Sequence, residues 1–272
     1  MMENGIYPDI SHKEYHSMID RISNSYLSRL AKCPAAAKVP VEETPAMTFG
    51  RALHSFILDG PVAFGSDVCV LPEINRRTNA GKALYEQIQK ENDGKAIITE
   101  EDLQSIIEMD RSVKAHPVAK QLIGNGTTEV SVFWDDPFSG LQCKARPDLI
   151  PGAIRNTLID LKSTRDASLH GFQRSVTGFG YHRQAAFYLD GMTKASGDVY
   201  DLFAFIAVET YEPYRTEVYT LSPTFIERGR TDYQMLITIE NKCRHAGEWP
   251  NYQSATVTEL EMPRYMAYQE EG

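Results

Sequence analysis

Apolar residues recur along this chain at two spacings, and the spacing changes near residue 125. In the first part they return every three or four positions, as on the buried face of an amphipathic helix. This pattern predicts helices over Ser25–Lys32, Ala46–Leu58, Gly81–Asn92, Glu100–Ala115 and Pro117–Gly124. Thr99 is the predicted cap of the fourth helix, because three acidic residues follow it in the first turn. Residues 1–125 are therefore predicted to be mainly helical.

Between residues 127 and 162 the pattern is typical of strands. Glu129–Trp134 alternates polar and apolar residues, as a half-buried strand does. Asp135–Gly140 is rich in turn-forming residues, and Leu141–Arg146 is predicted as the returning strand. The apolar run Thr157–Lys162 is predicted as the next strand. These three strands are expected to form one hairpin-and-strand sheet with acidic residues at its edge.

The rest of the chain alternates helices with strands. The predicted elements are helices over 167–177, 181–194 and Ser222–Arg244, and strands over Asp201–Glu209 and Tyr214–Leu221. Ser222 is the predicted cap of the last helix, with Pro223 in its first turn. The tail from Gly247 has little periodicity and is expected to be an arm that packs against a neighbour.

These elements predict an α/β protein with a mixed central β-sheet flanked by helices and a helical N-terminal portion. No repeat or low-complexity linker divides the 272 residues, so we expect one domain over 1–272. Its parts would be the mainly helical residues 1–125, an α/β core over 126–246 and a tail over 247–272. The 42% hydrophobic content is typical of soluble globular proteins. Without an 18-residue apolar run or a signal-peptide pattern, we expect a cytoplasmic protein with no membrane partner.

One short stretch carries the most specific chemistry. Asp148 follows a proline, and Asp160 and Lys162 stand two apart at the end of an apolar run. Residues two apart share one face of a strand, so Asp160 and Lys162 project together while Leu161 points into a core. Two carboxylates, with the Leu161 backbone carbonyl as a further ligand, suit Mg²⁺ and a water for phosphodiester hydrolysis. The lysine would orient that water or stabilise transition-state charge. A surface Asp–Lys pair at an exposed strand end is the alternative.

Two other segments supply candidate residues. Tyr181, Gln184 and Tyr188 fall on one face of their predicted helix. The Gln184 amide would hold a base edge, a phosphate or the pair of aspartates. Far upstream, His54 lies on an apolar helix and is a candidate metal ligand. The alternatives are packed tyrosines, an amide that caps a backbone group and a structural histidine.

In chain order, these residues resemble those of a known nuclease family. The motifs are Gly50-x-x-x-His54, Pro147-Asp148, Asp160-Leu161-Lys162 and Tyr181-x-x-Gln184-x-x-x-Tyr188. Their order is that of PD-(D/E)XK nucleases of the RecB type. Residues 10–16, 22–27 and 72–82 also resemble segments of the RecE-type exonuclease (exonuclease VIII) catalytic domain. The resemblance covers nearly the whole chain.

The resemblance implies the PD-(D/E)XK nuclease fold and a role for each matching residue. Asp148 and Asp160 would be metal ligands, and Asp160 stands where the family commonly has Glu. Lys162 would be the catalytic lysine, and His54 would be a ligand to a second metal. Gln184 and Tyr188 would support the site. Glu129, at the start of its predicted strand, resembles an acid near the metals of lambda exonuclease, and the ion would be Mg²⁺ or Mn²⁺.

The net charge and the cysteine positions limit how the protein could bind DNA and which cofactors it could hold. A net charge of −9 argues against a protein that coats DNA non-specifically, but not against an enzyme with a local basic channel. Arg76, Arg77 and Lys82 cluster in an Asn/Gly-rich predicted loop and are candidate DNA contacts, as is Tyr181. The cysteines are scattered, at positions Cys33, Cys69, Cys143 and Cys243, so no disulfide framework is expected. Some RecB-type nucleases bind an iron–sulfur cluster through three cysteines after the fold; only one is present here, so no iron–sulfur cluster is expected.

The resemblance implies a metal-dependent 5′-to-3′ exodeoxyribonuclease that degrades one strand of linear double-stranded DNA. Its 3′ single-stranded overhangs would serve homologous recombination by strand annealing. A ring-shaped homo-oligomer, a trimer or tetramer, would work beside a RecT-like single-strand annealing protein. Two alternatives stay open: an endonuclease or single-strand nuclease of the same fold, and a non-catalytic DNA-binding module.

Overall fold

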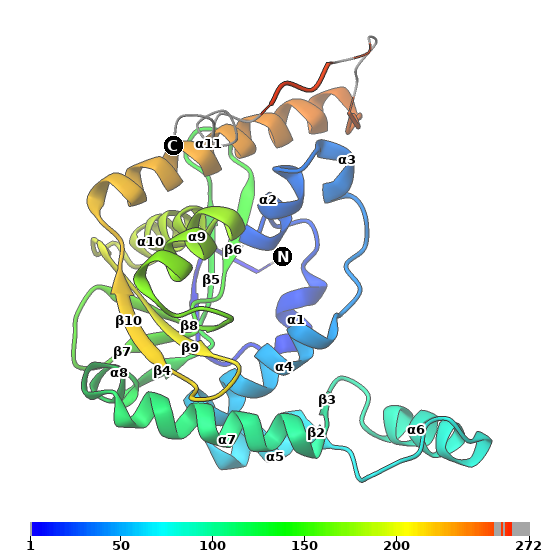
Figure 1. Ribbon diagram of the computed structural model, residues 1–272. Helices are drawn as coiled ribbons and strands as arrows, with labels where there is room; N and C mark the ends of the chain where they lie inside the picture. Colours follow the sequence, from blue (N-terminus) through cyan, green and yellow to red (C-terminus); the bar gives the residue numbers. More distant parts are fainter. Residues whose placement is uncertain (1, 253–256, 258, 263–272) are drawn as a thin grey trace.

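The computed structural model describes residues 2–252, 257 and 259–262, and its centre is a mixed five-stranded sheet (Figure 1). The strand order is β10 (Thr216–Thr220), β9 (Leu202–Glu209), β8 (Thr157–Thr164), β7 (Leu149–Pro151) and β4 (Gly126–Thr128). Strands β8 and β9 run parallel, whereas the other neighbouring pairs are antiparallel. The predicted α/β class with a mixed central sheet flanked by helices is confirmed.

The hairpin belongs to a second sheet. This antiparallel sheet has the order β1 (Gly5–Tyr7), β5 (Ser131–Asp135) and β6 (Gln142–Ala145). The prediction that the hairpin and residues 157–162 form one sheet was therefore wrong. Glu129 turns the chain before β5 with a left-handed φ of 52°, and the three-residue strand β7 pairs with β8 in place of the hairpin. Strand β5 is also buried on both faces from Ser131 to Trp134, not half-buried.

Most of the predicted helices are present with small shifts at their ends. The helices are α1 (His12–Ser17), α2 (Asn24–Leu30), α3 (Pro34–Ala37), α4 (Pro45–His54), the π-helical turn η1 (Ser55–Asp59), α5 (Pro61–Asp67), α6 (Asn79–Glu91), α7 (Glu100–Ala115), α8 (Pro117–Ile123), α9 (Leu169–Phe179), α10 (Tyr181–Ser196) and α11 (Pro223–Ala246). Thr99 caps α7 and Ser222 caps α11, as predicted. The short helices α1, α3 and α5 and the parallel pair β2 (Val68–Val70) and β3 (Ala96–Ile98) were not predicted. No helix in the described part of the chain is long and apolar enough to cross a membrane.

Side chains of β8 alternate between two hydrophobic cores, one on each face of the sheet. Leu158 packs in the core formed with α9, α10 and α11. Ile159 and Leu161 pack in the opposite core, which includes residues of α4, α7 and α8. Asp160 and Lys162 therefore face the side of α10, and the prediction that Leu161 points into a core is confirmed.

The start of the tail packs against its own chain. The Trp249 indole donates a hydrogen bond to Glu240 Oε2 at 2.9 Å, and Ala35 N donates to the Pro250 carbonyl at 3.1 Å. Glu240 is fully buried in α11. The predicted arm against a neighbour otherwise falls largely on residues 253–256, 258 and 263–272, which lie outside the described residues.

Gly229 sets the approach of α11 to α10, and its replacement by alanine is expected to destabilise the protein. A Cβ atom there would lie 2.1 Å from the His182 carbonyl oxygen, so the two helices would have to separate. We expect Gly229→Ala to lower the free energy of unfolding by about 1–3 kcal/mol in chemical denaturation. Gly178→Ala is the control, because a Cβ on this α9 residue meets no atom within 4 Å. The control should be stabilised by about 0.5–1 kcal/mol through helix propensity, and equal effects at both positions would contradict the packing argument.

Candidate active site

The middle of β8 carries an ion pair, and a side chain of α10 contacts it. Lys162 Nζ lies 2.6 Å from Asp160 Oδ2, and Gln184 Nε2 donates a hydrogen bond to Asp160 Oδ1 at 2.6 Å. Asp160 is fully buried. The structure thus brings Asp160, Lys162 and Gln184 together, and the amide of Gln184 fixes the orientation of the carboxylate.

Asp148 and His54 meet β8 from the other side. Asp148 lies just before β7, and its Oδ2 accepts a hydrogen bond from Leu161 N at 2.8 Å. His54, the last residue of α4, places Nε2 at 2.7 Å from the Leu161 carbonyl oxygen and 3.6 Å from Asp148 Oδ2. The same nitrogen cannot donate a proton to this carbonyl and ligate a metal. Metal binding through Nε2 of His54 would therefore replace its contact with Leu161.

Glu129 joins this group through a backbone turn that was not predicted. It follows β4 in the left-handed conformation, so the expectation that it starts the next strand was wrong. The ligand atoms of His54, Glu129 and Asp148 lie within 4.8 Å of one another. Arg146 Nε lies 2.7 Å from Glu129 Oε2. Arg146 was not predicted from the sequence to be a site residue, although its position two residues before Asp148 was a signal that it could lie in the same site.

Crowded carboxylates alter proton binding in this site. Burial raises the pKa of Glu129 to about 7, with a further rise from Asp148 that Arg146 opposes. Burial and Asp148 likewise raise the pKa of Asp160 to about 6, although Lys162 lowers it. For Lys162, burial lowers the pKa, but the charges of Asp160 and Asp148 outweigh this and hold it above its ordinary value. The same balance, with Asp148 and Glu129 as the carboxylates, raises the pKa of His54.

The residues fit a hard divalent cation. Beyond its ion pair with Lys162, the buried Asp160 Oδ2 accepts no hydrogen bond from the described residues. Burial, and after it the charge of Asp148, raises the pKa of the carboxyl groups of Glu129 and Asp160, so both charged forms lack full stabilisation in the metal-free protein. Carboxylate and carbonyl oxygens are the ligands that Mg²⁺ and Mn²⁺ prefer. Asp148, Glu129 and His54, whose ligand atoms lie within 4.8 Å of one another, could therefore hold such an ion, with Asp160 and the Leu161 carbonyl on the adjoining stretch of β8 as further oxygen ligands.

The raised pKa values predict that metal binding weakens in acid. In the metal-free protein, the stability from these bound protons is present below the ordinary pKa values and is lost as pH rises through about 6 for Asp160 and about 7 for Glu129. Because Mg²⁺ must displace the protons, we expect its affinity at pH 6 to be about tenfold lower than at pH 8. Calorimetric titration in buffers of different ionisation enthalpy would detect the released protons. Glu129→Gln should reduce this release, and a pH-independent affinity without proton release would refute the prediction.

The two tyrosines of the helix motif have different surroundings. The ring of Tyr181 is half-buried, and Lys162 Nζ lies 4.8 Å from its centre. Tyr188 packs beside Phe187 and Phe203, and burial raises the pKa of its hydroxyl. Tyr181 therefore lines the site in contact with Lys162, whereas Tyr188 packs in the core behind it.

The predicted DNA-binding cluster of Arg76, Arg77 and Lys82 lies elsewhere. Figure 1 shows α6 projecting from the body of the protein, away from the central sheet. Arg76 and Arg77 precede this helix as predicted, and Arg76 lies 4.1 Å from the centre of the Tyr85 ring. Lys82 does not lie in a loop, because Thr78 caps the helix and places Lys82 within its first turns. The structure does not bring this cluster to the carboxylates.

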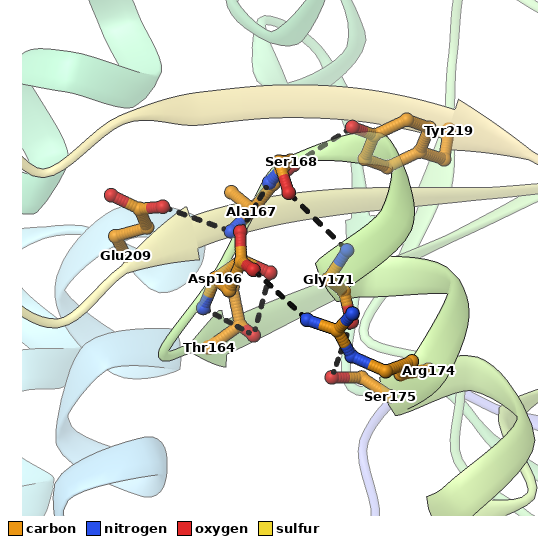
Figure 2. A network of polar contacts seen from close by, with 9 residues as sticks. All are labelled: Thr164, Asp166, Ala167, Ser168, Gly171, Arg174, Ser175, Glu209 and Tyr219. Atoms are coloured by element: carbon orange, nitrogen blue, oxygen red, sulfur yellow. Dashed lines mark hydrogen bonds and ion pairs between the residues drawn. The ribbon is translucent and has the colours of Figure 1, made fainter. Parts of the chain in front are cut away.

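A polar network fixes the loop that leaves β8 (Figure 2). Ala167 N donates a hydrogen bond to the buried Glu209 Oε1 at 3.0 Å, and the Tyr219 hydroxyl donates to the Ala167 carbonyl at 2.8 Å. Ser168 caps α9 by accepting from Gly171 N at 3.2 Å. The path from β8 into α9 and α10, the helix that supplies the amide donor, is therefore held on both sides of the turn.

Similar folds occur among solved structures. A protein from Eubacterium rectale, named "Putative exonuclease", has a crystal structure that aligns with a TM-score of 0.59 and 12% identity, covering 96% of this chain and 99% of that chain. At this identity the likeness concerns the fold alone. The crystal structure of SSO0001 aligns over 81% of this chain and 88% of that chain at 15% identity, but its TM-score of 0.29 is too low to indicate the same fold. A comparison with curated proteins gives no match.

A family match covers most of the chain and includes the gathered residues. The family described as "PDDEXK-like domain of unknown function (DUF3799)" matches residues 16–259. That span contains Asp148, Asp160 and Lys162. The chain therefore belongs to this PDDEXK-like family of unknown function and has the PD-(D/E)XK nuclease fold.

Proposed function

We propose that this protein is a metal-dependent deoxyribonuclease whose centre is formed by Asp148, Asp160 and Lys162. The observation that carries the proposal is the placement of two carboxylates and an ammonium along the middle of β8: Lys162 and Gln184 contact Asp160, and Asp148 accepts the Leu161 N–H bond. Membership of a PDDEXK-like family supports a nuclease of this superfamily.

Each residue has a definite task in phosphodiester hydrolysis. When bound, Mg²⁺ would polarise the phosphoryl oxygen and lower the pKa of a water. Asp148 and Asp160 would hold the cation, and Gln184 keeps the Asp160 carboxylate in place. Because its pKa is raised, Lys162 stays protonated at neutral pH. It therefore stabilises negative charge on the phosphate in the transition state and does not act as a general base.

More specifically, we propose that the enzyme is a 5′-to-3′ exonuclease that degrades one strand of linear double-stranded DNA and leaves 3′ overhangs for strand annealing. It is supported by the resemblance to RecE-type exonucleases in residues 10–16, 22–27 and 72–82, and by the name of the Eubacterium rectale protein of similar fold. The ring-shaped trimer or tetramer and the RecT-like annealing partner rest on that resemblance. Arg76, Arg77 and Lys82 would contact duplex DNA at a distance from the centre.

Digestion of a linear duplex labelled separately at each 5′ and 3′ end tests this proposal. With Mg²⁺, we expect early release of the 5′ label, persistence of the complementary strand and no cutting of a covalently closed circle. Chelation of the metal should stop the release. Cutting of the circle would favour an endonuclease of the same fold, and metal-dependent binding without any cleavage would favour a DNA-binding module.

A further inference from the structure

An exposed aromatic ring lies beside the candidate active site, at the corner between α9 and α10. Phe179, the last residue of α9, is 66% exposed. Its ring centroid lies 5.6 Å from that of Tyr181, and Lys162 Nζ lies 4.8 Å from the centre of the Tyr181 ring. A single ring therefore separates this exposed phenyl group from the lysine of the site.

The corner that carries Phe179 is firmly held. Tyr181 also packs against Phe205 of β9, at 5.8 Å between ring centroids. Gly180 adopts a left-handed φ of 72°, and the buried Arg183 packs where a Cβ of Gly180 would lie. The Arg183 guanidinium in turn donates a hydrogen bond to Ser28 Oγ at 2.7 Å. Phe179 is thus an exposed side chain on a well-packed junction between α9 and α10.

The surroundings of the ring favour a nucleic-acid ligand. Tyr181 is the only aromatic residue in contact with Phe179 in the described part of the chain. Arg174 lies on the same helix with its side chain 76% exposed, and its guanidinium pairs with Asp166 at 3.4 Å. Where the strand at Lys162 is separated from its complement, its bases lose stacking, and an exposed aromatic ring offsets that loss for any base.

We propose that Phe179 is the stacking platform for a nucleobase of the strand whose phosphate lies at Lys162. This assignment rests on the proposed nuclease function and adds a subsite for the base next to the site for the phosphate. Because every base has a π-face, the subsite would bind without sequence preference.

The test uses linear duplexes in which 2-aminopurine replaces successive bases near one 5′ end. Ca²⁺ replaces Mg²⁺, under conditions in which a gel shows the strand to be intact. For the wild type and Phe179→Tyr, we expect quenching of 2-aminopurine at one position. For Phe179→Ala and Phe179→Leu, we expect loss of that quenching and a Kd about 5- to 100-fold higher. Phe138→Ala is the matched control, because Phe138 is 85% exposed in the β5–β6 turn and has no aromatic partner among the described residues.

Three results would overturn the assignment. Phe179→Ala with unchanged quenching and Kd would remove Phe179 from the binding site of the base. An equal loss in Phe138→Ala would show a general surface effect. A change in oligomeric state by light scattering, with quenching retained, would make Phe179 a contact between copies of the chain. Failure of the proposed function is a separate result, because wild-type protein would then cleave no DNA with Mg²⁺.

Discussion

Lys162→Ala is expected to lower the single-turnover rate of DNA cleavage by about 10²–10³-fold, the usual loss when one electrostatic stabiliser of a transition state is removed. Binding of DNA should largely persist, because the proposed role of Lys162 is in the chemical step. Asp160 also loses its charged partner at 2.6 Å, so the pKa of its carboxyl should rise further.

Rapid-quench kinetics with excess enzyme would measure the rate, and fluorescence anisotropy with labelled duplex would measure binding. Lys120→Ala is a suitable control, since this exposed lysine of α8 lies outside the group around β8. A wild-type rate in Lys162→Ala would remove Lys162 from the chemical step. Loss of cleavage only in proportion to lost DNA binding would assign Lys162 to substrate binding.

Asp148→Asn is expected to abolish metal binding while it leaves the metal-free fold almost unchanged. Asp148 accepts the Leu161 N–H bond, and the carbonyl oxygen of an asparagine amide can accept the same bond. The negative charge is lost, however, and with it a ligand that Mg²⁺ needs. We expect the Mg²⁺ Kd to rise at least about 100-fold, because even indirect supports of a metal ligand are worth 10- to 100-fold.

Thermal unfolding with and without Mg²⁺ separates these effects. Wild-type protein should gain stability as Mg²⁺ is added, because the ion binds only the folded state. The Asp148→Asn variant should unfold near the metal-free wild-type temperature and should not respond to the ion. An undiminished metal response would show that the ion binds elsewhere, and a large loss of metal-free stability would assign Asp148 a structural role.

The helices and strands that could be predicted are those long enough for the spacing of apolar residues to repeat several times. The bounds of α7 match the predicted Glu100–Ala115, since sixteen residues display the apolar face repeatedly and Thr99 marks the start. Strands β4 and β7 have three residues each, too few to show an alternation. They are strands because they pair with each other and β7 also pairs with β8, a tertiary fact. The sheet to which the hairpin belongs depended on those same short strands.

The candidate site also has one part that local sequence patterns predict and another that depends on tertiary contacts. The shared face of Asp160 and Lys162 follows directly from their spacing on a strand. The contact of Gln184 with Asp160 requires α10 to cross β8, which no local pattern specifies. The approach of Glu129 to His54 requires a left-handed backbone at a residue other than glycine, a conformation that few such residues adopt.

The central claim is that the residues around β8 form a metal-dependent nuclease centre. Its most direct test is the release of nucleotides from a uniformly labelled linear duplex by wild-type protein, in Mg²⁺, after chelation and after Mg²⁺ is restored, beside Asp148→Asn purified in the same way. We predict release by the wild type that stops on chelation and resumes with the metal, and none by the variant. No release by metal-loaded wild-type protein, or equal release by Asp148→Asn, would contradict the account.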